Sequence, residues 1–349
     1  MEDEVKNVVC DFGNLYNAMK KCRKGVMWKD SVARYSNNGL VSILKLKDSL
    51  IDDTYKIDKY HEFTIHEPKK RDIVSTKFKD RVFQRSLCDN YAYKAITKDF
   101  IYDNGACQVD KGTDFARDRL ECHMQRHFRK FGTTGYVLGC DFKNFFGSTP
   151  HAIAKEVIAK RIDDEWALNH IFKIIDSFNQ GEKPDVGLGL GSQVTQLIQL
   201  AVLSELDHIV KEEFKIKSYL RYMDDMILIH SSKKHLDNCL DRIKEYIKSL
   251  GLTLNKKKTQ IYRVNQGINF LGFKFKLSES GKVIKTLSKE NIKKRKRKLR
   301  KYKKLVDEGR MTKEKADECY ESWKAHARKG NSYNLLKRMD EYYENLWKE

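Results

Sequence analysis

The segment from residue 217 to residue 230, KSYLRYMDDMILIH, limits the fold of this chain more than any other. Two apolar arms rich in β-forming residues enclose Asp224 and Asp225, which predicts a β-hairpin with both acids at its tip. Taken alone, two acids in a hairpin usually form only a tight turn. What these carboxylates do therefore depends on what folds against them.

A third acid ends a second apolar stretch, GYVLGCD at residues 135–141, which predicts a buried strand ending on Asp141. A single acid in that position is usually a turn or helix-cap residue. Three carboxylates brought together, however, repel one another and raise one another's pKa values. Divalent cations remove that penalty, and two Mg²⁺ ions about 3.5–4 Å apart stabilise both oxygens of an in-line phosphoryl displacement. Asp141, Asp224 and Asp225 are therefore candidate ligands of two such ions.

The net charge of +20 calls for a polyanionic partner. Nucleic acid is the first candidate, an anionic membrane surface the second, and a surface kept charged for solubility the simplest alternative. The stretch KKRKRKLRKYKK (293–304) has ten Lys or Arg in twelve positions and predicts a helix that binds phosphates and releases counterions. No 18-residue apolar run occurs and the N-terminus is acidic, so we expect no membrane span and no targeting peptide.

The remaining pattern predicts an α+β protein of two or three subdomains. Thr149 and Pro150 are expected to open a helix as N-cap and first helical residue, and residues 192–213 and 233–249 have helical periodicity. Residues 268–275 have strand composition with a kink at Gly272. The basic tail is expected to form helices broken at Gly309 and Gly330. The eight cysteines contain no C-x-x-C pair and are expected to be reduced.

At the acidic residues the sequence resembles the reverse transcriptases of prokaryotes, including group II intron and retron enzymes. Residues 222–225 read YMDD, the catalytic hairpin signature of that family, and residues 141–146 (DFKNFF) resemble its first catalytic motif. Further segments follow in the family's order from about residue 70 to residue 345: 69–73, 80–82, 104–107, 111–113, 251–259 and 268–275, the last of which resembles the primer-grip hairpin. Agreement of several ordered motifs is far more specific than any one of them.

The resemblance implies a right-hand polymerase with fingers, a palm containing an antiparallel sheet and the YMDD hairpin, and a helical thumb. It divides the chain into an N-terminal extension and fingers (1–131), a palm with part of the fingers (132–275) and a basic helical thumb (276–349). Residues 1–60 carry no motif that we can place. The implied chemistry is RNA-directed DNA synthesis with two Mg²⁺ ions, for which Mn²⁺ can substitute, and the implied location is the cytoplasm of a bacterium, in a bacterial or phage-encoded system.

The resemblance also assigns roles to single residues. Asp141, Asp224 and Asp225 would be catalytic and hold the metals together with Phe142, and Lys258 matches a lysine that protonates pyrophosphate. The nucleotide would contact Lys69 and Arg71 through its triphosphate, with Phe142 nearby and Phe146 as a gate against the ribose 2′-hydroxyl. Lys69 and Arg71 also fit a solvated surface, and Phe146 also fits plain core packing. Leu190, Gly191 and Gln196 would flank the nascent base pair.

One motif departs from most of the family. Residues 189–196 read GLGSQVTQ, with Leu190 where a glutamine is usual and Gln196 where a proline is usual. This form resembles diversity-generating retroelement enzymes and related defence-associated reverse transcriptases. Leucine supplies shape but no hydrogen bond, so the nascent pair loses a polar check, the sharper kind of discrimination. We therefore expect low fidelity.

The sequence thus predicts a reverse transcriptase of a diversity-generating retroelement, using an RNA template, a DNA or RNA primer and dNTPs. A small basic accessory protein or a dedicated non-coding RNA is the implied partner. One alternative is a defence-associated or abortive-infection enzyme with untemplated or protein-primed synthesis. The other is a nucleic-acid scaffold without catalysis. His66, His151 and His326 lack metal-binding spacing, and Trp323 is expected in the thumb core rather than as a base-stacking platform.

Overall fold

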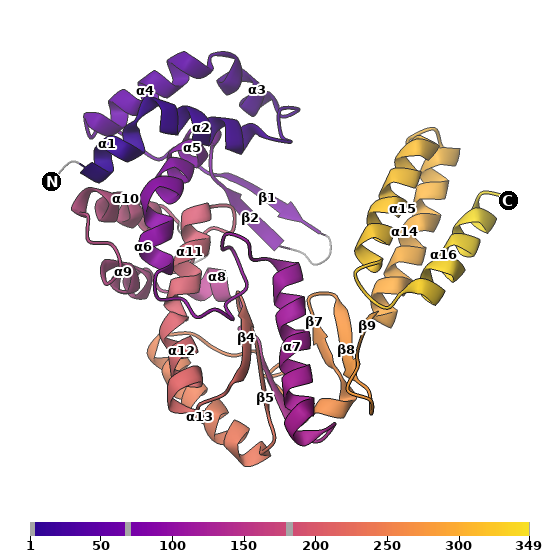
Figure 1. Cartoon of the computed structure of the whole chain (residues 1–349). Helices are drawn as coiled ribbons and strands as arrows, with labels where there is room; N and C mark the ends of the chain where they lie inside the picture. Colours follow the sequence, from indigo (N-terminus) through magenta and orange to yellow (C-terminus); the bar gives the residue numbers. More distant parts are fainter. Residues whose placement is uncertain (1–3, 67–70, 179–183, 349) are drawn as a thin grey trace.

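A computed structural model of the chain describes residues 4–66, 71–178 and 184–348. It opens with four helices, which form a lobe at the N-terminal end of the molecule (Figure 1): α1 (Glu4–Cys10), α2 (Phe12–Arg23), α3 (Asp30–Asn37) and α4 (Gly39–Ile51). The Asp11 carboxylate caps α2 by accepting a hydrogen bond from the Asn14 amide at 2.9 Å. Val9, Leu15 and Ile43 are fully buried in the core that this lobe shares with the next helices.

A two-stranded antiparallel hairpin follows, formed by β1 (His61–Ile65) and β2 (Arg71–Ser75). The chain then forms α5 (Phe78–Leu87), a π-helical turn η1 (Cys88–Ala92), α6 (Tyr93–Thr97) and the long α7 (Thr113–Phe131). α5 packs against α2, whereas α7 packs against strands β4 and β5 of the main sheet. The boundary expected at residue 131, between fingers and palm, falls at the end of α7. That helix packs on the central sheet, which the expected boundary assigns to the palm.

The central sheet has four antiparallel strands in the order β4-β5-β3-β6. They are β3 (Tyr136–Cys140), β4 (Ser218–Tyr222), β5 (Asp225–His230) and β6 (Gln260–Arg263). Successive side chains of β5 point to opposite faces of the sheet. Met226 and Leu228 belong to one hydrophobic core, and Ile227 and Ile229 belong to the other. Because both faces are covered by helices, the strands are continuously apolar instead of alternating apolar and polar residues. The buried strand and hairpin predicted around the three acids are confirmed.

The helices between β3 and β6 are α8 (Phe145–Ser148), α9 (His151–Ala159), α10 (Glu165–Asp176), α11 (Gln193–Val202), α12 (Ser204–His208), the π-helical η2 (Ile209–Glu213) and α13 (Lys233–Ser249). The helix predicted at 233–249 is confirmed, and the one predicted at 192–213 is broken at Leu203. The expected Thr149 cap is wrong, because Pro150 occupies the N-cap position. The buried Thr149 hydroxyl instead donates to the Phe145 carbonyl at 2.9 Å.

A second antiparallel sheet follows the 3₁₀ turn η3 (Val264–Gln266), with strands β7 (Ile268–Phe270), β8 (Phe273–Leu277) and β9 (Val283–Leu287). The hairpin that the resemblance implies at 268–275 is confirmed, whereas the strand kink expected at Gly272 is wrong. Leu271 and Gly272, with φ of 44° and 87°, form the two-residue turn of a hairpin. The expected palm boundary at residue 275 falls inside β8.

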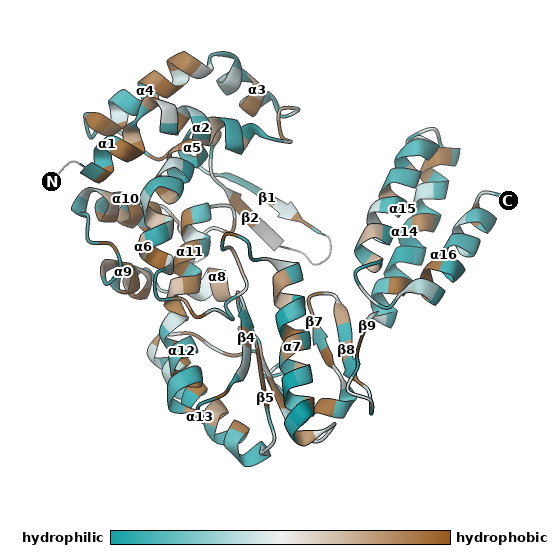
Figure 2. Ribbon diagram, in the orientation of Figure 1, coloured by the Kyte–Doolittle hydropathy of each residue, from teal (hydrophilic) through white to brown (hydrophobic). Residues whose placement is uncertain are grey.

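Three helices complete the chain and form a separate arm in Figure 1: α14 (Lys289–Asp307), α15 (Lys313–Ala327) and α16 (Tyr333–Leu346). Their breaks fall near Gly309 and Gly330 as predicted. Figure 2 shows hydrophobic residues along β5, while this arm is largely hydrophilic. None of the helices in the described ranges is long and apolar enough to cross a bilayer. The eight cysteines are free thiols.

Candidate active site

The hairpin of β4 and β5 closes on the pair Tyr222 and Asp225, which leaves Met223 and Asp224 as its turn. Met223 has φ of 54°, a left-handed conformation that is uncommon for a residue other than glycine. Such backbone conformations persist only where the surrounding structure enforces them, and they cluster at functional sites. The turn therefore places the carboxylates of Asp224 and Asp225 on a strained backbone that other residues must hold in place.

The register of β3 brings the third acid beside this tip. Cys140 pairs with Met226 on the neighbouring strand, so Asp141 leaves the sheet next to Asp225. The Asp141 side chain lies within hydrogen-bonding reach of the Asp225 carboxyl. Burial, followed by the negative charges of Asp224 and Asp141, raises the pKa of Asp225 to about 7. The strand register and these interactions place the three carboxylates in one neighbourhood, and their catalytic role stays a prediction.

A lysine also reaches the acidic cluster. The Lys258 ammonium donates a hydrogen bond of 2.5 Å to Asp141 Oδ2. Partial burial lowers the pKa of Lys258, but the hydrogen bond and charge of Asp141 outweigh it, so the pKa lies above its ordinary value. The loop that carries Lys258 is fixed on the same strand end, since the Asn255 amide donates to the Asp141 carbonyl at 2.8 Å.

The residues of this cluster fit divalent cations by their chemistry, although in the present positions they do not enclose one. Among the described residues, no three His, Cys, Asp or Glu side chains are grouped closely enough to hold a metal ion. Three carboxylates that share one electrostatic field are nonetheless the oxygen donors that Mg²⁺ prefers. The contact with Lys258 supplies positive charge to this field. Of Phe142, only the backbone carbonyl oxygen could serve as a ligand, because the phenyl ring carries no oxygen donor.

A buried ion pair supports the strained turn. Arg221 on β4 and Asp207 on α12 are both 0% exposed and form a bidentate pair, with Nε–Oδ1 at 2.7 Å and Nη2–Oδ2 at 2.6 Å. The same guanidinium donates to the Met223 carbonyl at 3.0 Å and to the Leu200 carbonyl at 3.0 Å. The Tyr219 hydroxyl donates to Asp207 at 2.6 Å. Arg221 therefore links α11, α12 and the turn that bears Asp224.

Sequence reasoning missed this pair, although its signal was present. Arg221 interrupts an apolar strand arm, and a charge there needs a buried partner. Burial alone lowers the pKa of the Arg221 guanidinium, but the charge of Asp207 reverses this, so the pKa is raised. The partner could not be found from the pattern, because Asp207 lies fourteen residues earlier on a helix.

A loop before α7 connects the turn to the 189–196 motif. The Gly105 amide donates to the Arg221 carbonyl at 2.9 Å, which fixes the loop on β4. Its Cys107 Sγ lies 3.8 Å from Met223 Sδ and 3.4 Å from Gln196 Oε1. Gln196 in turn donates to the Leu190 carbonyl at 3.3 Å. The residues predicted to flank the nascent pair are thus in a chain of contacts with the acidic hairpin.

The other predicted nucleotide residues are only partly placed. Phe142 and Phe145 are buried, whereas Phe146 is half-buried and meets Phe145 edge to face at 6.0 Å. Gly191 lies against β2, since a Cβ there would be 3.3 Å from the Val74 carbonyl oxygen. Lys69 and the side chain of Arg71 lie outside what the structure describes, so their predicted contacts with triphosphate stay predictions.

This fold, with an acidic hairpin on an antiparallel sheet, is that of the right-hand nucleic-acid polymerases. A telomerase structure from Candida albicans, in complex with a fragment of telomeric RNA, has a TM-score of 0.50 at 11% identity. The match covers 76% of this chain and 55% of that one. A truncated apo telomerase from Candida tropicalis has a TM-score of 0.49 at 16% identity and covers 65% and 55% of the two chains.

The sequence comparison identifies the family. The family model described as reverse transcriptase (RNA-dependent DNA polymerase) matches residues 68–275, more than half of the chain. This protein therefore belongs to the reverse transcriptase family. Protein P of duck hepatitis B virus (isolate brown Shanghai duck S5) is 31% identical over 114 residues. That match covers 31% of this chain and only 14% of the viral protein's length.

Replacement of Arg221 by methionine is expected to lower the free energy of unfolding by about 3–5 kcal/mol, because Asp207 then remains as a buried, unpaired charge. Urea unfolding followed by circular dichroism measures this. The double variant Arg221→Met/Asp207→Leu is expected to regain most of the loss. Lys244→Met, which removes an exposed pair with Asp241, serves as the control and leaves the unfolding midpoint unchanged. A loss below about 1 kcal/mol in Arg221→Met would contradict a supporting role.

Proposed function

We propose that this protein synthesises DNA on an RNA template and that Asp141, Asp224 and Asp225 carry the reaction. The observation that supports this most is the convergence of the three carboxylates at the end of β3 and the tip of the β4–β5 hairpin, where burial and then the charges of Asp224 and Asp141 raise the pKa of Asp225 to about 7. Such mutual repulsion is costly in a folded protein, and a polymerase uses it to bind divalent cations.

Two Mg²⁺ ions, held by these carboxylates and the Phe142 carbonyl, would activate the primer 3′-hydroxyl and neutralise charge on the leaving pyrophosphate. The chain itself supplies the fixed donor positions, through the sheet register and the buried Arg221 beneath the turn. Lys258, now on Asp141, is within reach of the same site and is the proposed proton donor to pyrophosphate. Mn²⁺ is expected to replace Mg²⁺ because it prefers the same ligands.

The proposed nucleotide pocket lies beside this centre. The half-buried ring of Phe146 is available to crowd a ribose 2′-hydroxyl, which the buried rings of Phe142 and Phe145 are not. Leu190 and Gly191 are proposed to flank the nascent pair, with Gln196 fixing the Leu190 backbone. Lys69 and Arg71 keep their proposed role at the triphosphate, for which ammonium and guanidinium groups are suited.

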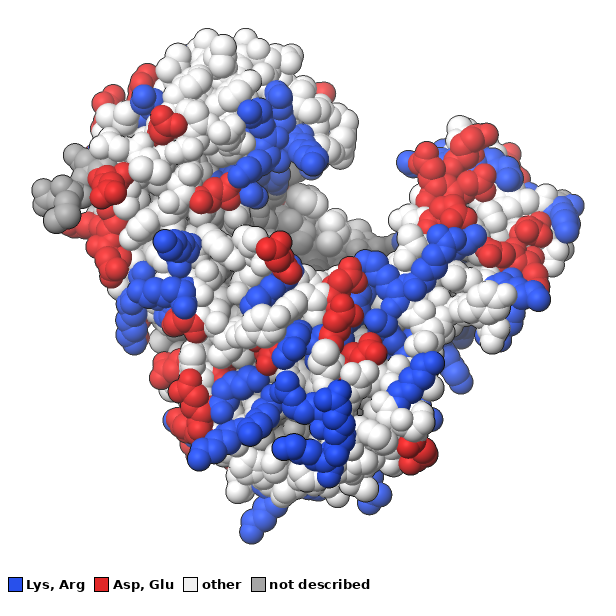
Figure 3. Space-filling view, in the orientation of Figure 1, with Lys and Arg blue, Asp and Glu red and all other residues white. Residues whose placement is uncertain are grey.

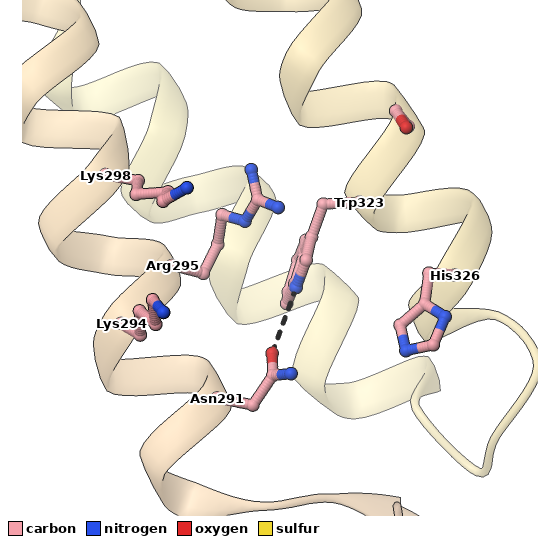
Figure 4. A pocket seen from close by; sticks show the side chains of 7 residues that line it. Asn291, Lys294, Arg295, Lys298, Trp323 and His326 are labelled. Atoms are coloured by element: carbon pink, nitrogen blue, oxygen red, sulfur yellow. Dashed lines mark hydrogen bonds between the residues drawn. The ribbon is translucent and has the colours of Figure 1, made fainter. Parts of the chain in front are cut away.

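The helical arm of residues 289–346 is proposed to act as a thumb that grips the template–primer backbone. Between α14 and α15 lies a cavity of about 360 Å³. Figure 4 shows Arg295 and Lys298 extending from α14 toward Trp323, and His326 on the α15 side. Trp323 is 5% exposed and donates to Asn291 at 3.3 Å, as expected for a core residue. Lysine and arginine side chains also gather along the base of this arm in Figure 3.

Within the family we propose a diversity-generating retroelement enzyme, on the form of the 189–196 motif. It would copy a dedicated RNA from a DNA or RNA primer with low fidelity, together with a small basic accessory protein. Untemplated or protein-primed synthesis in antiphage defence is the alternative within the enzyme class. Sequenced products that match a supplied RNA favour the retroelement enzyme, and products independent of that RNA favour the defence enzyme.

The double variant Asp224→Asn/Asp225→Asn is expected to reduce dNTP incorporation on an RNA template by on the order of 10³-fold, because the charge that binds the cations is removed. Primer extension with Mg²⁺ measures this. The matched control, Asp237→Asn/Asp241→Asn, removes two exposed carboxylates from α13 and leaves extension unchanged. Unchanged biological activity of the Asp224/Asp225 variant would favour a nucleic-acid scaffold.

Replacement of Leu190 by glutamine is expected to lower the misincorporation rate by about tenfold, because a polar group regains contact with the nascent pair. Leu190→Met keeps an apolar side chain of similar volume and is the matched control, with an unchanged error rate. Deep sequencing of cDNA copied from one defined RNA measures both. Equal error rates in Leu190→Gln and Leu190→Met would contradict the proposal that fidelity is low because residue 190 cannot hydrogen-bond.

A further inference from the structure

The loop between α2 and α3 carries a dense basic segment that the polymerase site does not use. Residues 20–29, KKCRKGVMWK, contain five Lys or Arg and no acid. They form the last turn of α2 and the loop that follows it, before α3 begins at Asp30. This segment precedes residues 68–275, the part matched by the reverse transcriptase family. We call residues 20–29 the Trp28 patch.

Trp28 stands out from this patch into solvent. Its side chain is 77% exposed, whereas Trp323 in the thumb is 5% exposed. A tryptophan ring offers one of the largest apolar surfaces of any side chain, so folding normally covers it. The Lys29 ammonium lies 5.3 Å from the centroid of the Trp28 ring, close enough for a cation–π contact. An exposed aromatic face beside a cation is thus built into the loop.

The loop turns in open solvent at Gly25. Gly25 has φ of 75°, and a Cβ at that position would meet no atom within 4 Å. Gly25 is therefore exposed, whereas the next residue, Val26, packs against the core of the lobe. Met27, next to Trp28, is 43% exposed. The two side chains form an open apolar surface with cations around it.

The cations of the patch are largely available to an anionic ligand. Among the described residues, Lys21 alone of the five lies within 4 Å of a carboxylate, that of Asp89 at 2.7 Å. Lys20 instead lies 5.0 Å from the centroid of the Tyr16 ring. Figure 3 shows Lys and Arg side chains gathered over this part of the N-terminal lobe, on the side that faces the opening toward the thumb. Phosphates would relieve the repulsion among these charges.

We propose that the Trp28 patch is a second nucleic-acid site, which binds a single strand by stacking an unpaired base on Trp28. Lys24 and Lys29 would neutralise the phosphates on either side. Unpaired bases expose their faces to aromatic side chains, whereas paired bases in a duplex are already stacked on one another. The site is separate from the acidic centre and does not depend on the proposed catalysis. RNA and DNA share this chemistry, and both enter the test.

The fluorescence of Trp28 reports on this site directly. The difference in emission between the full-length protein and Trp28→Phe isolates the exposed indole, and neither Mg²⁺ nor dNTPs are added. Single-stranded 12-nucleotide RNA and DNA of the same sequence are titrated separately, with the hairpin duplex of that sequence and phosphatidylserine vesicles in parallel. A quench of the Trp28 emission by single strands, at a concentration at least about tenfold below that needed for duplex, is expected.

Variants then test the two halves of the site. Trp28→Ala and Lys24→Ala/Lys29→Ala are each expected to weaken single-strand binding at least about tenfold by fluorescence anisotropy of a labelled strand, measured with the polymerase site saturated by a blocked primer–template. Lys234→Ala/Lys248→Ala on α13, two lysines that are also exposed, is the matched control and leaves binding unchanged. Primer extension on a short primer–template is expected to persist in Trp28→Ala.

Four outcomes would overturn the proposal. They are an unchanged Trp28 emission with both strands, an equal response to duplex, a blue shift with vesicles only, and unchanged affinity in both patch variants. A quench by RNA without DNA, or by both, supports it and states which strand is preferred. Loss of primer extension in the Asp224→Asn/Asp225→Asn variant leaves this assay unaffected, so failure of either proposal is seen separately.

Discussion

The mutual repulsion of three carboxylates at the end of β3 and the tip of the β4–β5 hairpin is the constraint to which the rest of this structure responds. Burial of Asp225, followed by the negative charges of Asp224 and Asp141, raises its pKa to about 7. A fold that tolerates this must fix the backbone rigidly and supply positive charge. The two-faced sheet provides the first requirement, and Lys258 on Asp141 provides the second.

The buried pair of Arg221 and Asp207 shows how the rigidity is achieved. Buried ion pairs are poor sources of stability compared with apolar packing, because desolvation opposes their attraction. Here the guanidinium also binds the carbonyl of Met223, whose left-handed backbone sets the direction of Asp224. The main role of the ion pair is therefore to fix the geometry of the turn rather than to stabilise the fold. It couples the acidic turn to α12, on the helical layer behind the sheet.

The sequence predicted the parts of this protein where local pattern and global fold agree. The apolar strand before Asp141, the YMDD hairpin and the helix at 233–249 follow from periodicity and turn chemistry alone. Thr149 does not cap the helix, because its buried hydroxyl donates to the Phe145 carbonyl instead. Gly272 alone indicates a kink and not a turn, because the other left-handed residue of the turn is Leu271, and leucine carries no turn signal. The partner of Arg221 is set by packing, which sequence spacing does not encode.

The most direct test of this account is where manganese binds in crystals grown with a template–primer, a dNTP and Mn²⁺. We expect two anomalous-scattering peaks about 3.5–4 Å apart, each within coordination distance of Asp141 or Asp225, with Lys258 released from Asp141. Absence of manganese from these carboxylates in a crystal that contains bound dNTP, with the Lys258–Asp141 contact intact, would contradict the account.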